Sequence, residues 1–129
     1  PDSINAIDWT YKTQYKDLVD YYAALAAIRH AHPGFCLGDA DLVREKLQFI
    51  ETEDPCVVAF RISGLEGIDS AKSLTVLLNG SQKQAKVEIP QGNYTVLAQL
   101  GYADADGIGA YSGNTISAGA TSATILAEN

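Results

Sequence analysis

The chain has 129 residues, of which 47% are hydrophobic and 19% charged, so it can build about one domain with its own core and is not of the disordered class. Its formal net charge of −7 argues against binding the nucleic-acid backbone, because that affinity comes from clustered Lys and Arg. No apolar run reaches the roughly 18 residues of a membrane-spanning helix, so no membrane span is expected. The two cysteines, Cys36 and Cys56, are expected to be buried free thiols, with a single disulfide as the alternative.

The first 14 residues have no sustained hydrophobic period and predict an ordered loop anchored by burial of Ile4, Ile7 and Trp9. Residues 15–34 predict one long amphipathic helix that ends at Pro33 and Gly34. One face of this helix carries residues at three- and four-residue spacing: Leu18, Tyr21, Tyr22, Leu25, Ile28 and His32. A second flank holds the small residues Val19, Ala23, Ala26 and Ala27. Two packing flanks indicate a helix that joins two bodies.

The remainder of the chain predicts β-structure. Asp39 or Asp41 can cap one short turn through about Arg44, after which the pattern alternates. The predicted strands are 46–52, 56–63, 74–78, 84–89, 94–100, 114–118 and 123–127. Asn79-Gly80 predicts a tight hairpin, Pro90-Gln91-Gly92 a turn, and residues 101–113 a long loop or loosely paired hairpin. The fold class is therefore mainly β, an antiparallel β-sandwich of about seven strands preceded by one long amphipathic α-helix.

The residues by themselves do not form a catalytic or metal site. Glu51, Glu53 and Asp54 cluster where a solvated turn is expected between two strands. Asp104 and Asp106 fit part of a calcium loop, but its further ligands are missing. His30 and His32 point in different directions on a helix and cannot chelate one metal ion. We therefore assign no catalytic residue, no metal ligand and no cofactor. Trp9, Tyr11, Tyr15, Tyr102 and Tyr111 are aromatic residues outside strand interiors that could pack or stack on sugars.

Several motifs occur together in a recognisable order. They are Ser3-Ile4-Asn5-Ala6-Ile7-Asp8-Trp9, Leu25-Ala26-Ala27-Ile28-Arg29-His30-Ala31-His32-Pro33-Gly34-Phe35, Leu47-Gln48-Phe49, Val57-Val58-Ala59-Phe60-Arg61, Leu77-Leu78-Asn79 and Ile89-Pro90-Gln91-Gly92-Asn93-Tyr94. This pattern resembles the C-terminal end of type I pullulanases, the debranching enzymes of glycoside hydrolase family 13 in the α-amylase superfamily. The resemblance covers residues 1–100 well and the rest more weakly.

The resemblance implies that residues 1–34 are the end of a catalytic (β/α)8 barrel and residues 35–129 a C-terminal β-sandwich domain. It implies that the helix packs on the barrel by one flank and on the sandwich by the other. The family's catalytic carboxylates lie upstream, and none maps to this segment. Asp2 and Asn5 would be substrate-binding residues in the parent enzyme, although the Arg that several relatives carry four residues after Asp2 is Ala6 here.

The function expected from the resemblance is a non-catalytic domain of a pullulanase-like α-1,6-glucan debranching enzyme that packs against and stabilises the barrel. This chain alone is not expected to be an enzyme, whereas its parent is. The alternatives are a carbohydrate-binding module for α-glucans and an adhesion-type sandwich. Expected partners are the barrel and, through the parent, pullulan, branched starch or glycogen. The isolated chain is expected to dimerise through Leu18, Tyr22 and Leu25, and its bacterial location stays open between cytoplasm and secretion or the cell surface.

Overall fold

The computed structural model describes residues 2–129, with side chains from residue 4 onward. Its helical part begins with α1 (Asp2–Asn5) and α2 (Tyr11–Gln14) and continues with the long helix α3 (Lys16–Ala31). A 3-10 turn, η1 (Pro33–Cys36), and helix α4 (Ala40–Lys46) follow. Of the two predicted capping residues, Asp39 caps α4, because its carboxylate accepts the N–H groups of Asp41 and Leu42. Within the described part of the chain, none of these helices is long and apolar enough to cross a membrane.

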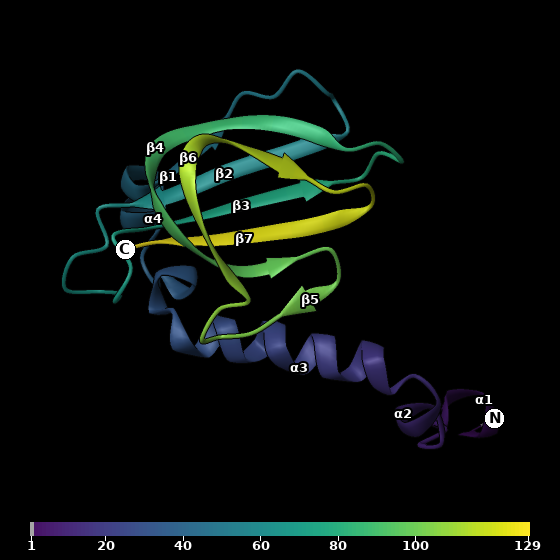
Figure 1. Ribbon diagram of the computed structural model, residues 1–129. Coiled ribbons are helices and arrows are strands. Elements are labelled where there is room, and N and C mark those ends of the chain that lie inside the picture. The colour runs from purple at the N-terminus through teal and green to yellow at the C-terminus, as the bar shows by residue number, and fades with distance from the viewer. Residues whose placement is uncertain (1) are drawn as a thin grey trace.

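Seven antiparallel strands form the rest of the molecule (Figure 1). They are β1 (Leu47–Ile50), β2 (Val57–Ser63), β3 (Ser73–Asn79), β4 (Ala85–Gln99), β5 (Tyr102–Ala103), β6 (Gly109–Ala118) and β7 (Ser122–Glu128). The hydrogen-bonded order is β1-β2-β3-β7-β4-β5, and β6 pairs with β4. The prediction of a mainly β, antiparallel fold with a preceding helix is confirmed.

The long strand β4 folds this sheet over on itself. Its second half pairs with β7, whereas β6 pairs with both halves, and the register shifts between Glu88 and Gly92. Pro90 lies within this irregular stretch, where its missing N–H removes no regular ladder bond. The first half of β4 and its partner β6 therefore cover one face of the main sheet (Figure 1). The core between the two layers consists of Val57, Ala59, Leu77, Val87, Ile89, Tyr94, Val96, Ile116, Ala118 and Leu126.

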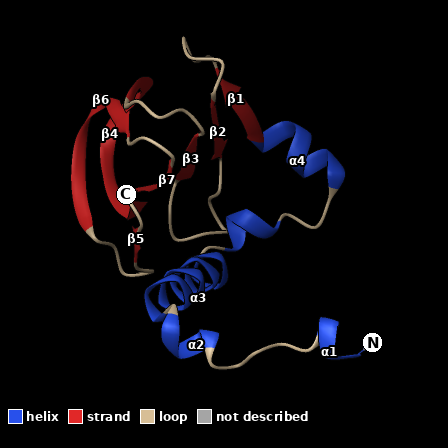
Figure 2. Cartoon of the chain, turned by 90° about the vertical axis from the view of Figure 1, so that its right-hand side faces the viewer, coloured by secondary structure: helices blue, strands red, loops and turns tan. Residues whose placement is uncertain are grey.

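Helix α3 covers part of the opposite face of the sheet. Ile28, which is 1% exposed, belongs to a second core with Leu74, Leu97 and Ala127 from three strands, and Leu25 packs against this cluster. Figure 2 shows α3 and η1 on this face, with α4 beyond the β1 edge. Because strand side chains alternate between faces, the main sheet contributes apolar residues to both cores.

The predicted hairpin at Asn79-Gly80 is wrong. Strand β3 pairs with β2 and β7 rather than with β4. Residues 80–84 cross to the other layer, where β4 begins at Ala85. Asn79 is buried and stabilises this crossing, since its amide nitrogen contacts the carbonyl oxygens of Lys83, Ala118 and Gly119. Its side-chain oxygen accepts the N–H of Ser81. The Asn79-Gly80 pair therefore marks the point where the chain changes layer. This crossing depends on the contact between Asn79 and Gly119, which lies 40 positions later in the chain.

Three other local predictions need correction. The strands predicted at 84–89 and 94–100 form the single bent strand β4, because the Pro90 turn is absorbed as a bulge. The N-terminal segment contains two short helices instead of a loop, and its anchors are uncovered: Ile4 is 77% exposed and Trp9 73%. Cys36 and Cys56 are free thiols as expected, but both are exposed.

The substitution Asn79→Ala is expected to lower the free energy of unfolding by about 2–4 kcal/mol, because it leaves buried carbonyl groups and the Ser81 N–H without partners. Urea denaturation measures this change. Asn114→Ala, at an exposed position of β6, is the control and should change stability by less than about 0.5 kcal/mol. Equal effects of the two substitutions would show that Asn79 does not hold the crossing.

Candidate functional site

The sequence-predicted substrate residues lie on the N-terminal segment. Asp2 and Asn5 bound the short helix α1, which lies away from the sandwich (Figure 1). The side chain of Asn5 is exposed, and the side chain of Asp2 falls outside the described part of the structure. The structure brings neither residue next to the other polar clusters of the chain.

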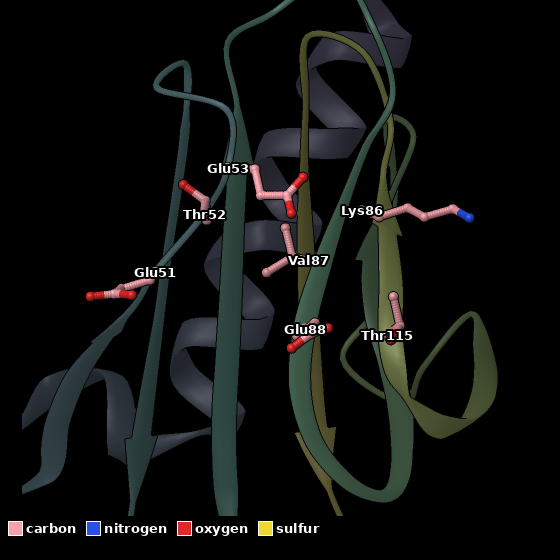
Figure 3. A pocket seen from close by; sticks show the side chains of 7 residues that line it. All are labelled: Glu51, Thr52, Glu53, Lys86, Val87, Glu88 and Thr115. Carbon is pink, nitrogen blue, oxygen red and sulfur yellow. The ribbon is translucent and has the colours of Figure 1, made fainter.

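The clustered carboxylates lie at an open groove of about 530 Å³ (Figure 3). Glu51 and Glu53 come from the β1–β2 connection, and Glu88 joins them from β4 beside Lys86. All four side chains belong to exposed residues, so they are solvated by water and lack the buried surroundings that tune catalytic carboxyl groups. The sequence did not reveal Glu88 as a neighbour, because the bend of β4 places it there.

The Asp-rich loop is likewise organised by its own backbone. Asp104 accepts the N–H of Asp106 at 2.8 Å through its side-chain oxygen, which is an ordinary Asx turn. Among residues 2–129, no group of three or more His, Cys, Asp or Glu side chains is placed to hold a metal ion.

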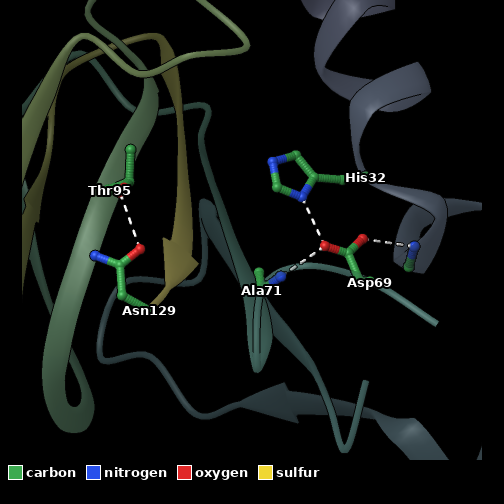
Figure 4. Close-up of polar contacts among 6 residues, drawn as sticks. His32, Asp69, Ala71, Thr95 and Asn129 are labelled. Atoms are coloured by element: carbon green, nitrogen blue, oxygen red, sulfur yellow. Dashed lines mark hydrogen bonds and ion pairs between the residues drawn. The ribbon is translucent and has the colours of Figure 1, made fainter. Parts of the chain in front are cut away.

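A largely buried polar contact joins the end of α3 to the β2–β3 loop. Nδ1 of His32 lies 2.8 Å from Oδ1 of Asp69, whose side chain is fully buried (Figure 4). Because a carboxylate only accepts, Nδ1 carries the hydrogen. The Asp69 carboxylate also accepts the backbone N–H groups of Gly34 and Ala71, each at 2.9 Å. One carboxylate thus joins the helix end, the following turn and the start of β3.

We call the contacts of Asp69 with His32, Gly34 and Ala71 the joint, and Gly34 is required for it. A Cβ atom at this position would lie 2.8 Å from Cδ1 of Leu65 and 3.0 Å from Cδ1 of Leu74. Such distances are below van der Waals contact, so a side chain would push the turn away from the sheet. The Pro33-Gly34 stop seen in the sequence is therefore also a close-packing site.

The joint has an electrostatic consequence. Burial by itself would raise the pKa of Asp69, but the hydrogen bonds from Ala71, His32 and Gly34 together outweigh burial and hold this pKa below its usual value. Asp69 therefore stabilises the fold in its charged form.

The outer flank of α3 is apolar and uncovered. Leu18 is 53% exposed and Tyr22 66% exposed, and the aromatic residues Trp9, Tyr11 and Tyr15 continue this surface toward the N-terminus. We call these five residues the outer face. Leu25, two turns after Leu18 on nearly the same side of α3, is half-buried and packs with the sheet-facing cluster, so only part of the predicted dimer trio is exposed.

A second uncovered apolar area lies on the sheet face that α3 covers only in part. Phe49 is 75% exposed, Val58 47% and Leu78 45%. Val58 is paired directly with Leu78, and Phe49 with Phe60, so these side chains occupy neighbouring positions of β1, β2 and β3. Both apolar areas exceed what scattered surface residues explain and are typical of an interaction surface.

The fold thus defines an all-β sandwich domain with a helix fixed to one sheet face and an apolar surface beside it. Residues 43–100 match the family model described as the pullulanase, all-beta domain. The predicted resemblance to the C-terminal part of pullulanases is therefore confirmed.

Individual pullulanases show the same similarity over a wider range. The pullulanase of Bacillus subtilis strain 168 is 29% identical over 89 residues, which are 69% of this chain and 12% of that protein. The structure of the pullulanase from Bacillus acidopullulyticus has a TM-score of 0.89 at 28% identity, covering 98% of this chain and 15% of that one. A mutant pullulanase from Paenibacillus barengoltzii, complexed with maltotetraose, has a TM-score of 0.79 at 29% identity, covering 98% and 19% respectively. The chain thus spans less than a fifth of each of these relatives.

The joint predicts a specific pH dependence of stability for Asp69→Asn. The pKa of Asp69 is lower in the folded than in the unfolded state. Its contribution to the free energy of unfolding is therefore complete above the unfolded pKa of about 3.9, and it is lost as the pH falls through the folded pKa. At pH 7 the variant should be less stable by about 1–3 kcal/mol.

The difference between wild type and Asp69→Asn should shrink as the pH falls below about 4, measured by thermal unfolding across the pH range. Asp41→Asn is the matched control, because Asp41 forms an exposed ion pair with Arg44 and should matter little at any pH. A difference that stays constant down to pH 2 would contradict the electrostatic account.

Proposed function

We propose that this chain is the non-catalytic β-sandwich segment of a pullulanase-like α-1,6-glucan debranching enzyme, and that it packs against and stabilises the catalytic barrel. The observation that carries the proposal is the division of α3. Its C-terminal half is fixed to the sheet by Ile28 and by the His32–Asp69 contact, whereas Leu18 and Tyr22 in its N-terminal half are uncovered. An apolar stripe held on a rigid support is suited to permanent contact with another domain.

In this proposal, residues 1–34 complete the barrel and residues 35–129 form the sandwich domain. The exposed Ile4, Ile7 and Trp9 are then buried by the barrel, which accounts for apolar anchors without a partner in this chain. Asp2 and Asn5 contact the glucan substrate only in the whole enzyme, which supplies the catalytic carboxylates. The proposed glucan is pullulan, branched starch or glycogen.

The substitution Leu18→Asp in the whole enzyme tests the stabilising role. It places a charge in the proposed interface and should accelerate thermal inactivation, at a cost of about 2–4 kcal/mol in interface stability. The values of kcat and KM, measured well below the inactivation temperature, should stay within twofold of wild type, since Leu18 is given no catalytic task.

Asp41→Leu, at an exposed position of α4, is the control for changing the polarity of a surface residue. A large fall in kcat for Leu18→Asp at low temperature would contradict a purely stabilising role. Unchanged thermal inactivation would show that the barrel does not cover the outer face.

The isolated chain should dimerise, because the outer face is otherwise left in water. Sedimentation is expected to show concentration-dependent association that Tyr22→Lys weakens at least tenfold. Ala23→Lys introduces the same charge at an exposed position on another side of the same helix and should leave association unchanged. A wild-type chain that remains monomeric at millimolar concentration would argue against the outer face as a self-association surface.

A further inference from the structure

A second surface of α3 has the composition of a sugar-binding site. A groove of about 280 Å³ runs between the N-terminal half of α3 and the short strand β5, and it is lined by Asp17, Asp20, Tyr21, Gly101, Tyr102 and Ala103. Figure 1 shows β5 directly beside this helix. Tyr102 is 73% exposed, although its neighbour in the groove, Tyr21, is half-buried.

The turn that carries Tyr102 is rigidly placed. Leu100 and Gly101 have φ angles of 52° and 83°, which is the left-handed pair of a two-residue hairpin turn. Leucine is uncommon in this conformation, so the surrounding structure must hold it there. Gly119 provides the room, because a Cβ at this position would lie 2.1 Å from Cδ2 of Leu100. Tyr102 therefore follows a defined two-residue turn, and its ring is uncovered.

The chemistry of this groove suits a neutral polyhydroxyl ligand. Tyrosine rings present apolar faces on which the C–H side of a pyranose ring can stack, and their hydroxyl groups remain available for hydrogen bonds. The carboxylates of Asp17 and Asp20 can accept hydrogen bonds from sugar hydroxyls, and Lys16, which forms an ion pair with Asp20, can donate one. The carboxylate groove at Glu51, in contrast, has no aromatic residue in its lining.

The groove continues past Tyr21. A neighbouring depression of about 360 Å³ also includes Tyr21 and Gly101, and it adds Leu78, Asn79 and Ser122 to the lining. Each depression has room for roughly one or two hexose rings, near the lower end of small-molecule pockets. Two depressions that share a tyrosine form a path suited to a short linear chain of sugars.

We propose that the groove formed by Asp17, Asp20, Tyr21 and Tyr102 is a binding subsite for a linear α-glucan chain. The sugar class follows from the match to the pullulanase all-beta domain, and the site does not depend on the docking of the outer face. At 100° per residue, Asp20 and Tyr22 point in directions about 200° apart on α3. The Asp20 side of the groove therefore lies away from the outer face, whereas Tyr21 lies about 60° from Leu18 around the helix.

Affinity electrophoresis of the 129-residue chain through gels with amylopectin tests the subsite, and amide NMR shifts with maltotetraose locate it. Wild type should be retarded, with a weak dissociation constant of about 1–10 mM for the tetrasaccharide and shifts at Asp17, Tyr21 and Tyr102. Tyr102→Ala should weaken binding at least fivefold, and Tyr102→Phe should keep most of it because the ring face remains. Asp17→Ala should also weaken binding.

Phe49→Ala is the control, since Phe49 is a similarly exposed aromatic residue that lines neither depression. Its binding should equal that of wild type. Absence of retardation and of shifts at about 50 mM maltotetraose would overturn the subsite, as would binding that survives Tyr102→Ala or disappears in Phe49→Ala. None of these results alters the sedimentation test of the outer face, so failure of the subsite and failure of the docking proposal are distinguishable.

Discussion

The contact between His32 and Asp69 is the constraint on which the arrangement of this molecule depends. The buried carboxylate binds the last side chain of the helical segment, the Gly34 N–H and the Ala71 N–H, so three segments meet at one group. A buried charge is tolerated only when it is fully hydrogen-bonded, and here the hydrogen bonds outweigh the cost of burial. With its C-terminal end fixed, α3 lies along one sheet face and presents its remaining sides to other partners.

The second constraint is the bend of β4, which closes the other face of the sheet. A single strand belongs to both layers, and the inner core is filled from both. Beside this core, the half-buried Arg61 pairs with Glu128, which also accepts the hydroxyl of Ser73. Burial would raise the pKa of Glu128, but the hydrogen bonds from Ser73 and Arg61 and the nearby positive charges lower it. These polar contacts therefore join β2 and β3 to the last strand, β7, within the main sheet.

These two constraints explain how one helix can serve several purposes. Its inner side is committed to the sheet, its outer face carries Leu18 and Tyr22, and its third side forms a groove with Tyr102. The proposed barrel contact and the proposed glucan subsite use different sides of α3, so the two proposals are compatible.

The sequence by itself determined the long helix, its stop at Pro33-Gly34, the Asp39 cap, most strand positions and the resemblance to pullulanases. These features depend on local periodicity, turn chemistry and short motifs, which neighbouring residues carry. The tertiary structure alone decided that Asn79 marks a change of layer, that β4 is one bent strand and that Asp69 receives His32 from 37 positions away. It also decided which flank of α3 is buried, and brought Tyr102 beside Asp17 and Asp20. Such pairings depend on how distant segments pack, and no local pattern encodes them.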